Sequence, residues 1–318
     1  MTSIQAQVNT RLLAKASRLF TGTLAGRIIE ILQNARRAGA KHVIITNHNG
    51  LVTIRDDGRG ITDFAKLLDL GGSGWQPNLE SSEDPAGVGL FSLAPRKLTV
   101  RSRGHKVVID ESGWTGTPVE VLTDPPGLPI CPPDITAGAG TELEFADDPW
   151  DAAQVKSRAV FTGLEVVVDN EPCPSERFLT GRAVTYRELG CRIQVVPESA
   201  VSHWHRDAAL SHNFCDNVLL NFHGQVVAFG YHPTSNHNLH FLVELTGQPT
   251  GIRLMLPART CLVANDAFTQ LKAALEREAF LYLKRQRHHR LPYKEYLRAK
   301  ELGIELPESE PVYRVGLL

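Results

Sequence analysis

The sequence predicts an α+β protein with two folded domains, and three observations support that prediction. The chain has 318 residues, which is enough for two substantial cores. An amphipathic helical stretch at 27–40 is followed at once by a strand pair, and short strands and helices alternate after it. An acidic, proline-containing turn at 147–150 interrupts this alternation. We therefore expect a first domain over 1–148, a second over 149–270, and a helical, basic C-terminal segment over 271–318.

The charge balance and the cysteines limit the expected location and partners. Thirty-four basic and 35 acidic side chains give a formal net charge of -1, so no bulk attraction to nucleic acid or membrane is expected. The five cysteines are odd in number and form no CxxC pair, which favours reduced thiols in a cytosol. The sequence shows neither a signal peptide nor an apolar run of about 18 residues. We therefore expect a cytoplasmic protein without a membrane span.

The helical stretch at 27–40 carries two polar residues on one side. Glu30 and Asn34 stand four residues apart, so both side chains project from the same face of the predicted helix. Simple surface exposure is one explanation, because such residues are mostly exposed. A functional pair is the other. The apolar face of the helix is formed by Ile28, Ile31, Leu32 and Ala35, and Gly39 ends it.

Three glycine-containing motifs follow the helix in order. A hairpin, with strands at 42–46 and 51–55 and a turn at Asn49-Gly50, runs into Asp56-Asp57-Gly58-Arg59-Gly60. A glycine loop at 84–90, DPAGVGL, then opens an apolar helical run. Finally, Gly140-Thr141 opens a strand at 142–145. Each motif alone is common in ordinary turns, so only the order of the motifs along the chain is informative.

In this order, the helix and the three motifs resemble the ATPase superfamily of gyrase, heat-shock chaperones, histidine kinases and MutL, called GHKL. The resemblance covers about one domain's length, over 1–148. It implies an ATP-binding α/β sandwich, the Bergerat fold, with ATP and Mg²⁺ as cofactors. It also implies a slow, switch-like ATPase in which nucleotide drives a conformational change or the formation of a homodimer.

The resemblance implies a role for each polar motif residue. Glu30 matches the general base that activates water beside the γ-phosphate. Asn34 matches the magnesium ligand, and a neutral oxygen suits a hard cation that already holds water and phosphate oxygens. Asp56 matches the acceptor of the adenine amino group, and it would reject guanine, which presents a carbonyl there. Asp57 is the variable position and reads as a turn residue.

The glycines and their neighbours complete the implied nucleotide site. Gly58 and Gly60 would let the backbone approach the base, although a plain turn explains them too. Gly87 and Gly89 would present backbone N–H groups to the phosphates at a helix N-terminus. Thr141 would complete the adenine pocket through its hydroxyl. The other residues placed around the nucleotide are Ile61, Gly72, Ser73, Val88 and Leu90.

Three positions depart from the family pattern. Arg37 stands where the family helix often carries an aspartate. Asp84 stands where the glycine loop commonly begins with glycine. The expected lid at 71–86 contains acidic residues but neither lysine nor arginine, so positive charge for the phosphates must come from elsewhere. Within that lid, Trp75 fits a simple satellite hydrophobic contact better than packing against the closed lid.

The second half predicts another α+β arrangement with a mixed sheet. We expect helices at 154–162 and 266–284, and strands at 165–168, 191–196, 217–222, 225–229, 240–245 and 252–256. The stretch from 239 to 263 resembles, more loosely, the transducer domain of MutL and type II topoisomerases. In that domain a loop lysine reaches the γ-phosphate, and Arg259 stands in the corresponding loop here. An arginine can bind phosphate bidentately, but Arg259 could equally cap the following helix.

Two further clusters allow other functions. Histidine and cysteine ligand types suit zinc, but their spacing matches no known finger, and an exposed loop or short helix over 199–214 is the alternative; the cluster is His203, His205, His212 and Cys215. Basic and tyrosine residues alternate over 282–298 and could contact a nucleic acid backbone or an acidic protein face. A solvated helix face is the alternative.

These observations together predict Mg²⁺-dependent ATP binding and slow hydrolysis that act on a partner protein or a nucleic acid. Two alternatives remain: a nucleotide-binding module with little or no hydrolysis, and a nucleic-acid interaction protein that uses the basic C-terminal segment. The length of the chain disfavours a histidine kinase, a full heat-shock chaperone and a gyrase subunit, because each of these carries further segments.

Overall fold

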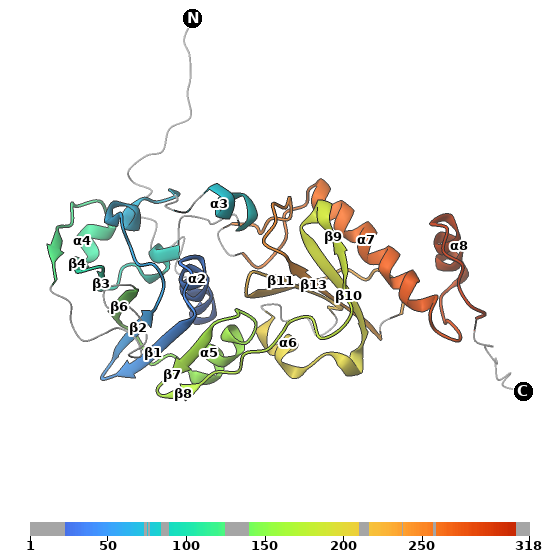
Figure 1. The fold of residues 1–318 in the computed structure, drawn as a ribbon, viewed down its shortest axis with the longest axis horizontal. Coiled ribbons are helices and arrows are strands. Elements are labelled where there is room, and N and C mark those ends of the chain that lie inside the picture. Colours follow the sequence, from blue (N-terminus) through green and yellow to red (C-terminus); the bar gives the residue numbers. More distant parts are fainter. Residues whose placement is uncertain are drawn as a thin grey trace, which may run out of the picture. The chain divides into compact units, whose positions relative to one another are not determined.

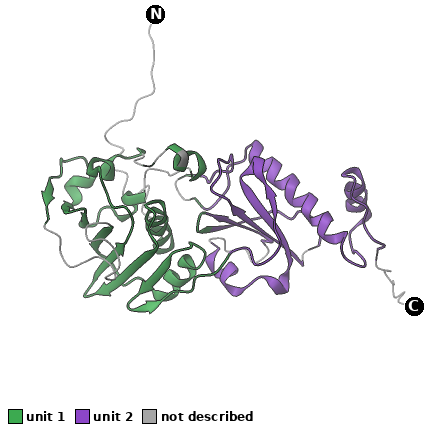
Figure 2. Cartoon of the chain, in the orientation of Figure 1, with its two compact units in different colours: residues 1–177, 223–225, 256–259 green, residues 178–222, 226–255, 260–318 purple. Residues whose placement is uncertain are grey.

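The computed structural model describes residues 23–72, 75, 77–83, 89–124, 140–209, 216–236, 238–256 and 259–309 (Figure 1). The predicted α+β class is confirmed, with one mixed sheet of eight strands and one of five. The chain forms two compact units (Figure 2). Unit 1 contains the chain up to Arg177 and two later segments, 223–225 and 256–259, and unit 2 contains the rest.

Unit 1 is built on the eight-stranded sheet, with the order β5-β4-β3-β6-β2-β1-β7-β8. Within the described residues, β1 and β7 run parallel and the other paired neighbours run antiparallel. The β2–β6 pairing sets Asp56 opposite Thr141, so the ends of two predicted motifs become neighbours. The strands are β1 (His42–His48), β2 (Leu51–Asp56), β3 (Leu98–Ser102), β4 (His105–Ile109), β5 (Val121–Thr123), β6 (Thr141–Ala146), β7 (Glu165–Val168) and β8 (Glu171–Pro172).

The hairpin predicted around Asn49-Gly50 is confirmed as β1 and β2. Both turn residues have positive φ, 50° at Asn49 and 76° at Gly50, which is the conformation that an Asn-Gly hairpin turn requires. The hairpin fixes the register of β2 against β1 and therefore the place where β2 ends, at Asp56.

Helix α2 (Leu24–Arg37) is the predicted motif helix. Its first turn is capped by Thr23, whose Oγ1 accepts a hydrogen bond from the Gly26 N–H at 3.2 Å. The apolar stripe is buried, with Ile28 and Leu32 in the core of unit 1. The other helical elements of unit 1 are η1 (Phe64–Leu68), α3 (Pro77–Glu83), η2 (Gly89–Leu93), α4 (Glu111–Trp114) and α5 (Ala152–Ala159).

Unit 2 is built on the five-stranded sheet, with the order β12-β11-β13-β10-β9. The long helix α7 (Asp266–Leu283) packs against β10, and its apolar residues Leu271, Leu275 and Phe280 join the core. The strands are β9 (Val184–Tyr186), β10 (Cys191–Pro197), β11 (Val218–Phe222), β12 (Gln225–Phe229) and β13 (Leu239–Leu245). The remaining helical elements are η3 (Arg187–Leu189), η4 (Glu198–Ala200), α6 (His203–Ala208) and α8 (Tyr293–Glu301).

The unit boundary differs from the predicted boundary at 148/149, because the segment 149–177 lies in unit 1. Trp150 is 2% exposed and packs against Phe145, and β7 pairs with β1 of the first sheet. The proline-containing turn that interrupts the pattern is therefore internal to unit 1. The predicted separate segment at 271–318 is also not a unit of its own, because α7 and α8 belong to unit 2.

Two further comparisons with the predicted elements concern short segments. The strand expected at 252–256 is absent within the described residues of that segment, which form only an isolated bridge between Leu254 and Leu262. The helical run expected after the glycine loop is the short 3-10 helix η2. Among the described helices, none has the length and apolar character needed to cross a bilayer.

Candidate functional site

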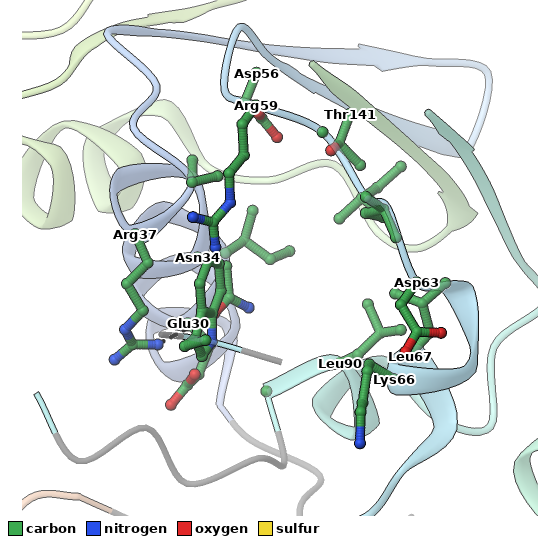
Figure 3. Close-up of a pocket in the computed structure, with 18 of the residues that line it drawn as sticks. Glu30, Asn34, Arg37, Asp56, Arg59, Asp63, Lys66, Leu67, Leu90 and Thr141 are labelled. Atoms are coloured by element: carbon green, nitrogen blue, oxygen red, sulfur yellow. Dashed lines mark hydrogen bonds between the residues drawn. The ribbon is translucent and has the colours of Figure 1, made fainter. Parts of the chain in front are cut away.

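Unit 1 contains a pocket of about 250 Å³ between α2, the end of β2, η1, η2 and β6 (Figure 3). This volume is close to the lower end of the range for small-molecule sites, roughly 300–1,000 Å³. Figure 3 shows Asp56 and Thr141 at one end of the pocket and Glu30 and Asn34 at the other. The residues of the predicted nucleotide site that line it are Glu30, Asn34, Asp56, Gly60, Ile61, Gly72, Gly89, Leu90 and Thr141.

The end of the pocket formed by Asp56, Gly58, Gly140 and Thr141, here called the base end, is held by hydrogen bonds close to the backbone. The Gly58 N–H donates to Asp56 Oδ1 at 2.9 Å. Burial raises the pKa of Asp56 to about 6, against the lowering effect of that N–H. A buried acceptor that ionises near neutral pH suits a ligand N–H donor.

Glycine is required at Gly140 for the base end to form. Its φ is +100°, and a Cβ on it would lie 2.3 Å from the carbonyl oxygen of Asp56. The Ser102 hydroxyl stabilises this turn through two hydrogen bonds. It donates to the Gly140 carbonyl at 2.6 Å and accepts from the Ile61 N–H at 2.9 Å. Asp57 lies outside the pocket lining and accepts from the Lys41 and His42 N–H groups, as a turn residue would.

The opposite end is lined by Glu30, Asn34 and Arg37. Together with Glu83 and Arg259, which hydrogen-bond to these residues, it is here called the acid–amide end. Arg259 Nη1 donates to Glu30 Oε1 at 2.8 Å. Arg37 Nη1 donates to Asn34 Oδ1 at 3.1 Å. The predicted base and the predicted metal ligand therefore each accept a hydrogen bond from an arginine.

A buried carboxylate holds Arg37 in place. Arg37 is 5% exposed and donates its Nε–H to Glu83 Oε2 at 2.9 Å. Arg36 pairs with the other carboxylate oxygen of Glu83 at 2.5 Å. Burial would raise the pKa of Glu83, but the charges of Arg36 and Arg37, with that of His223, hold it below its usual range. The arginine at the family's aspartate position is therefore part of an ion-pair cluster with α3.

Arg259 lies on 256–259, one of the two later segments of the chain that belong to unit 1. Its backbone has a φ of +54°, and its carbonyl accepts from Gln225 Nε2, on the other later segment, at 2.5 Å. Its side chain is 4% exposed and also donates to Gln33 Oε1 at 3.0 Å. The alternative that Arg259 caps the following helix is wrong, because Asn265 caps α7 by accepting from the Phe268 N–H.

Gly89 is the point where the glycine loop meets the acid–amide end. A Cβ on Gly89 would lie 2.8 Å from Glu30 Oε2 and 3.1 Å from Asn34 Nδ2, so no larger residue fits without displacing them. The predicted phosphate-binding residues Gly87 and Val88, and the predicted lid residue Ser73, lie outside the described residues.

The pocket also contains residues that the sequence prediction missed. Arg59, Asp63 and Lys66 line it, although no nucleotide role was assigned to them. Trp75 lines it too, and the Arg59 guanidinium lies 5.2 Å from the centre of its ring, so Trp75 is not a simple hydrophobic contact. The one available signal for Arg59 was its place between the two glycines of the strand-end motif.

The two other predicted clusters lie in unit 2. His205 is 1% exposed, and its ring nitrogens contact Ser202 Oγ and the Phe178 carbonyl oxygen, so it is a core histidine. His212 and Cys215 lie outside the described residues, and the described part of the chain contains no histidine, cysteine or carboxylate group arranged to hold a metal. In the basic run, Lys284, Arg285 and Arg287 are exposed.

A scan against models of known protein families finds no match for this chain, and a search of curated proteins finds no significant relative.

Proposed function

We propose that the pocket of unit 1 binds ATP together with Mg²⁺ and hydrolyses it slowly. The observation that carries the proposal is that a partly buried carboxylate, Asp56, and an acid–amide pair, Glu30 and Asn34, line opposite ends of one pocket (Figure 3). The Asp56 carboxylate is suited to bind the nucleotide base, and the pair of Glu30 and Asn34 is suited to a phosphate group with its metal ion. The agreement of this pocket with the GHKL motif order supports the same function.

Adenine recognition would rest on Asp56. An adenine amino group donates to its carboxylate, whereas guanine would set a carbonyl oxygen against it and leave two acceptors face to face. The strand pairing that sets Thr141 opposite Asp56 supports this role, because it brings a hydroxyl to the same end of the pocket. We therefore expect binding of ATP and rejection of GTP.

Hydrolysis would rest on Glu30, as the base that accepts a proton from the attacking water. That role requires Glu30 to give up its ion pair with Arg259. A γ-phosphate would compete for the guanidinium, because arginine binds phosphate through two parallel charge-assisted hydrogen bonds. ATP binding would then free the base and move Arg259 in one step. Since the chain on both sides of 256–259 belongs to unit 2, the same exchange would pass the state of the nucleotide to that unit.

The residues at the acid–amide end fit a magnesium ion that is held mostly by phosphate and water. Asn34 Oδ1 would be the protein ligand, and its carbonyl oxygen has a second lone pair beside the one that accepts from Arg37. Bound there, Mg²⁺ would neutralise the phosphate charge. Arg37 keeps the amide oriented, since the same side chain is anchored to Glu83.

A nucleotide-binding module without hydrolysis is a second candidate, and a specific observation favours it. Both Glu30 and Asn34 already accept hydrogen bonds from arginines, so the catalytic end is satisfied without a ligand. If Arg259 stays on Glu30 when ATP binds, the base remains neutralised. Single-turnover hydrolysis with protein in excess over ATP separates the two candidates, because a pure binding module releases ATP unchanged.

Calorimetry with ATP and GTP tests the proposal, using the parent protein, Asp56→Asn and Asp57→Asn. The parent should bind ATP and not GTP, and Asp56→Asn should lose ATP binding. Asp57→Asn is a matched control, because it removes the same charge from the next residue, which lies outside the pocket lining. Failure of the parent to bind ATP would reject the proposed function.

We further propose that nucleotide binding promotes a homodimer that acts on a protein partner or a nucleic acid. Light scattering with a non-hydrolysable ATP analogue checks the first part, since the expected mass doubles when the analogue is added. A mass that stays that of the monomer at saturating analogue would reject it.

A further inference from the structure

Arg59 places a guanidinium inside the pocket, between its two ends. Figure 3 shows the side chain leaving the strand-end motif near Asp56 and running beside α2 toward Asn34. The guanidinium lies over the ring of Trp75, 5.2 Å from the ring centre. A cation held over an aromatic face is attracted to the ring but keeps its full charge.

Arg59 differs in its ion pairing from the other basic residues of the described pocket lining. Three basic side chains belong to the described lining. Arg37 is paired with Glu83 at 2.9 Å, and Lys66 is paired with Asp69 at 2.9 Å. Arg59 has no acidic partner among the residues that the structure describes. It is therefore the cation of the described lining that can meet a negative ligand without first breaking an ion pair.

The carboxylates of the lining favour such a cation beside an anionic ligand. Glu30, Asp56 and Asp63 all line the pocket, and an ionised carboxylate repels a phosphate group unless a positive charge lies between them. The lid segment at 71–86 contributes no lysine or arginine. The positive charge that the sequence leaves unassigned is therefore supplied by the strand-end motif itself.

We propose that Arg59 binds the α- and β-phosphates of the nucleotide, with Trp75 holding its guanidinium in position. This inference rests on the proposed function and names the residue that recognises the diphosphate. The side chain runs between the base end and the acid–amide end, which is where the phosphates nearest the sugar would lie. Its planar fork can donate two hydrogen bonds to one phosphate group. The γ-phosphate is left to Arg259 and to the magnesium ion that Asn34 would hold.

Calorimetry with ATP, ADP and adenosine tests this role in the parent, Arg59→Ala and Arg59→Lys. Arg59→Ala should weaken ATP and ADP binding by about ten- to a hundredfold, the size of one or two charge-assisted hydrogen bonds, and leave adenosine binding unchanged. Arg59→Lys should be intermediate, because it keeps the charge and loses the fork. Trp75→Leu should weaken ATP and ADP by a smaller factor.

Arg55→Ala is the matched control. Arg55 is also an exposed arginine of the same strand region, but it pairs with Glu142, which keeps its second partner Arg101. Its loss should leave all three affinities unchanged, so a general effect of net charge is excluded.

Three outcomes would overturn the inference. Unchanged ATP and ADP binding in Arg59→Ala would show that the guanidinium does not contact phosphate. An equal loss for ATP, ADP and adenosine would show that Arg59 shapes the pocket instead. A loss for ATP alone would assign it to the γ-phosphate. In each of these cases the parent still binds ATP, whereas a parent that binds no adenine nucleotide would reject the proposed function and this inference together.

Discussion

The two ends of the pocket are built in opposite ways. The base end is formed by residues at two strand ends that are paired in the sheet, Asp56 on β2 and Thr141 on β6. The acid–amide end is formed by charged side chains far apart in the sequence, such as Glu30 with Arg259 and Arg37 with Glu83. The base end holds its acceptor, the Asp56 carboxylate, in place through the Gly58 N–H and the pairing of β2 with β6. The acid–amide end satisfies its own charges and must rearrange to bind one.

This difference suggests that recognition and chemistry are controlled separately. The backbone fixes the geometry of the base end, so little free energy is lost in rearranging it when a ligand binds. Such a site favours affinity and selectivity. In the proposed ATPase, a self-paired acid–amide end would keep Glu30 inactive until a ligand competes for Arg259, which would favour slow, conditional turnover.

Glu30→Gln should lower ATP turnover by roughly 10²–10⁴-fold and leave ATP affinity within a fewfold of the parent. Glutamine keeps an oxygen that accepts from Arg259, so the fold is preserved, but it cannot take a proton from water. Steady-state phosphate release and calorimetry measure the two quantities. Turnover equal to that of the parent would remove Glu30 from the base role.

Glu83→Gln should destabilise unit 1 by about 3–5 kcal/mol, because it leaves the buried guanidinium of Arg37 without a counter-charge. Chemical denaturation measures the loss. Glu80→Gln, one turn earlier in α3, is the matched control and should change stability by less than about 0.5 kcal/mol. Equal effects for the two variants would show that the ion-pair cluster does not hold the acid–amide end.

Gly140→Ala should destabilise the protein by about 1–3 kcal/mol and weaken ATP binding, since a Cβ there would collide with the Asp56 backbone. Gly163→Ala is the control, because Gly163 also has positive φ, +75°, but has open space around its Cβ position. It should cost about 1 kcal/mol and leave ATP affinity unchanged. Identical losses of ATP affinity would mean that backbone strain, and not the close approach at the base end, decides binding.

ATP affinity should fall as the pH falls through about 6, by at most about tenfold per pH unit. Burial raises the pKa of Asp56 to about 6, so the carboxylate proposed to accept the adenine amino group is protonated below that pH. The same shift makes ionisation of Asp56 cost stability as the pH rises from about 4 to about 6. Calorimetry between pH 5 and pH 8 measures the slope, and a flat profile would contradict adenine recognition by an ionised Asp56.

The same contrast between the two pocket ends decides which parts of the structure can be predicted from the sequence. The helix α2, the hairpin and the strand-end glycines lie in local patterns of a few residues, and the structure forms α2 and the hairpin where those patterns indicate. Asp56 and Thr141 could be paired only through motif order, yet sheet pairing then sets them opposite each other. The motifs that form this pocket end are therefore visible in the sequence, whereas the pairing of β2 with β6 that joins them is a long-range contact.

The acid–amide end could not be predicted in the same way. The pairing of Arg37 with Glu83 joins residues 46 positions apart, with β1, β2 and η1 between them, and that of Arg259 with Glu30 spans most of the chain. The spacing of residues in the sequence does not indicate which distant charged residues will pair. The boundary between the two units could not be predicted for a related reason. The parallel pairing of β7 with β1 joins strands separated by more than a hundred residues, and the composition of a turn does not reveal such a pairing.

The central claim is that one pocket holds adenine at Asp56 and the terminal phosphate at Glu30. A crystal structure of the protein with a non-hydrolysable ATP analogue and Mg²⁺ tests it most directly. We predict the adenine amino group within hydrogen-bond distance of the Asp56 carboxylate, and a Glu30 carboxylate separated from Arg259 and facing the γ-phosphate. An analogue bound elsewhere, or bound in this pocket with its base at Glu30, would contradict the account.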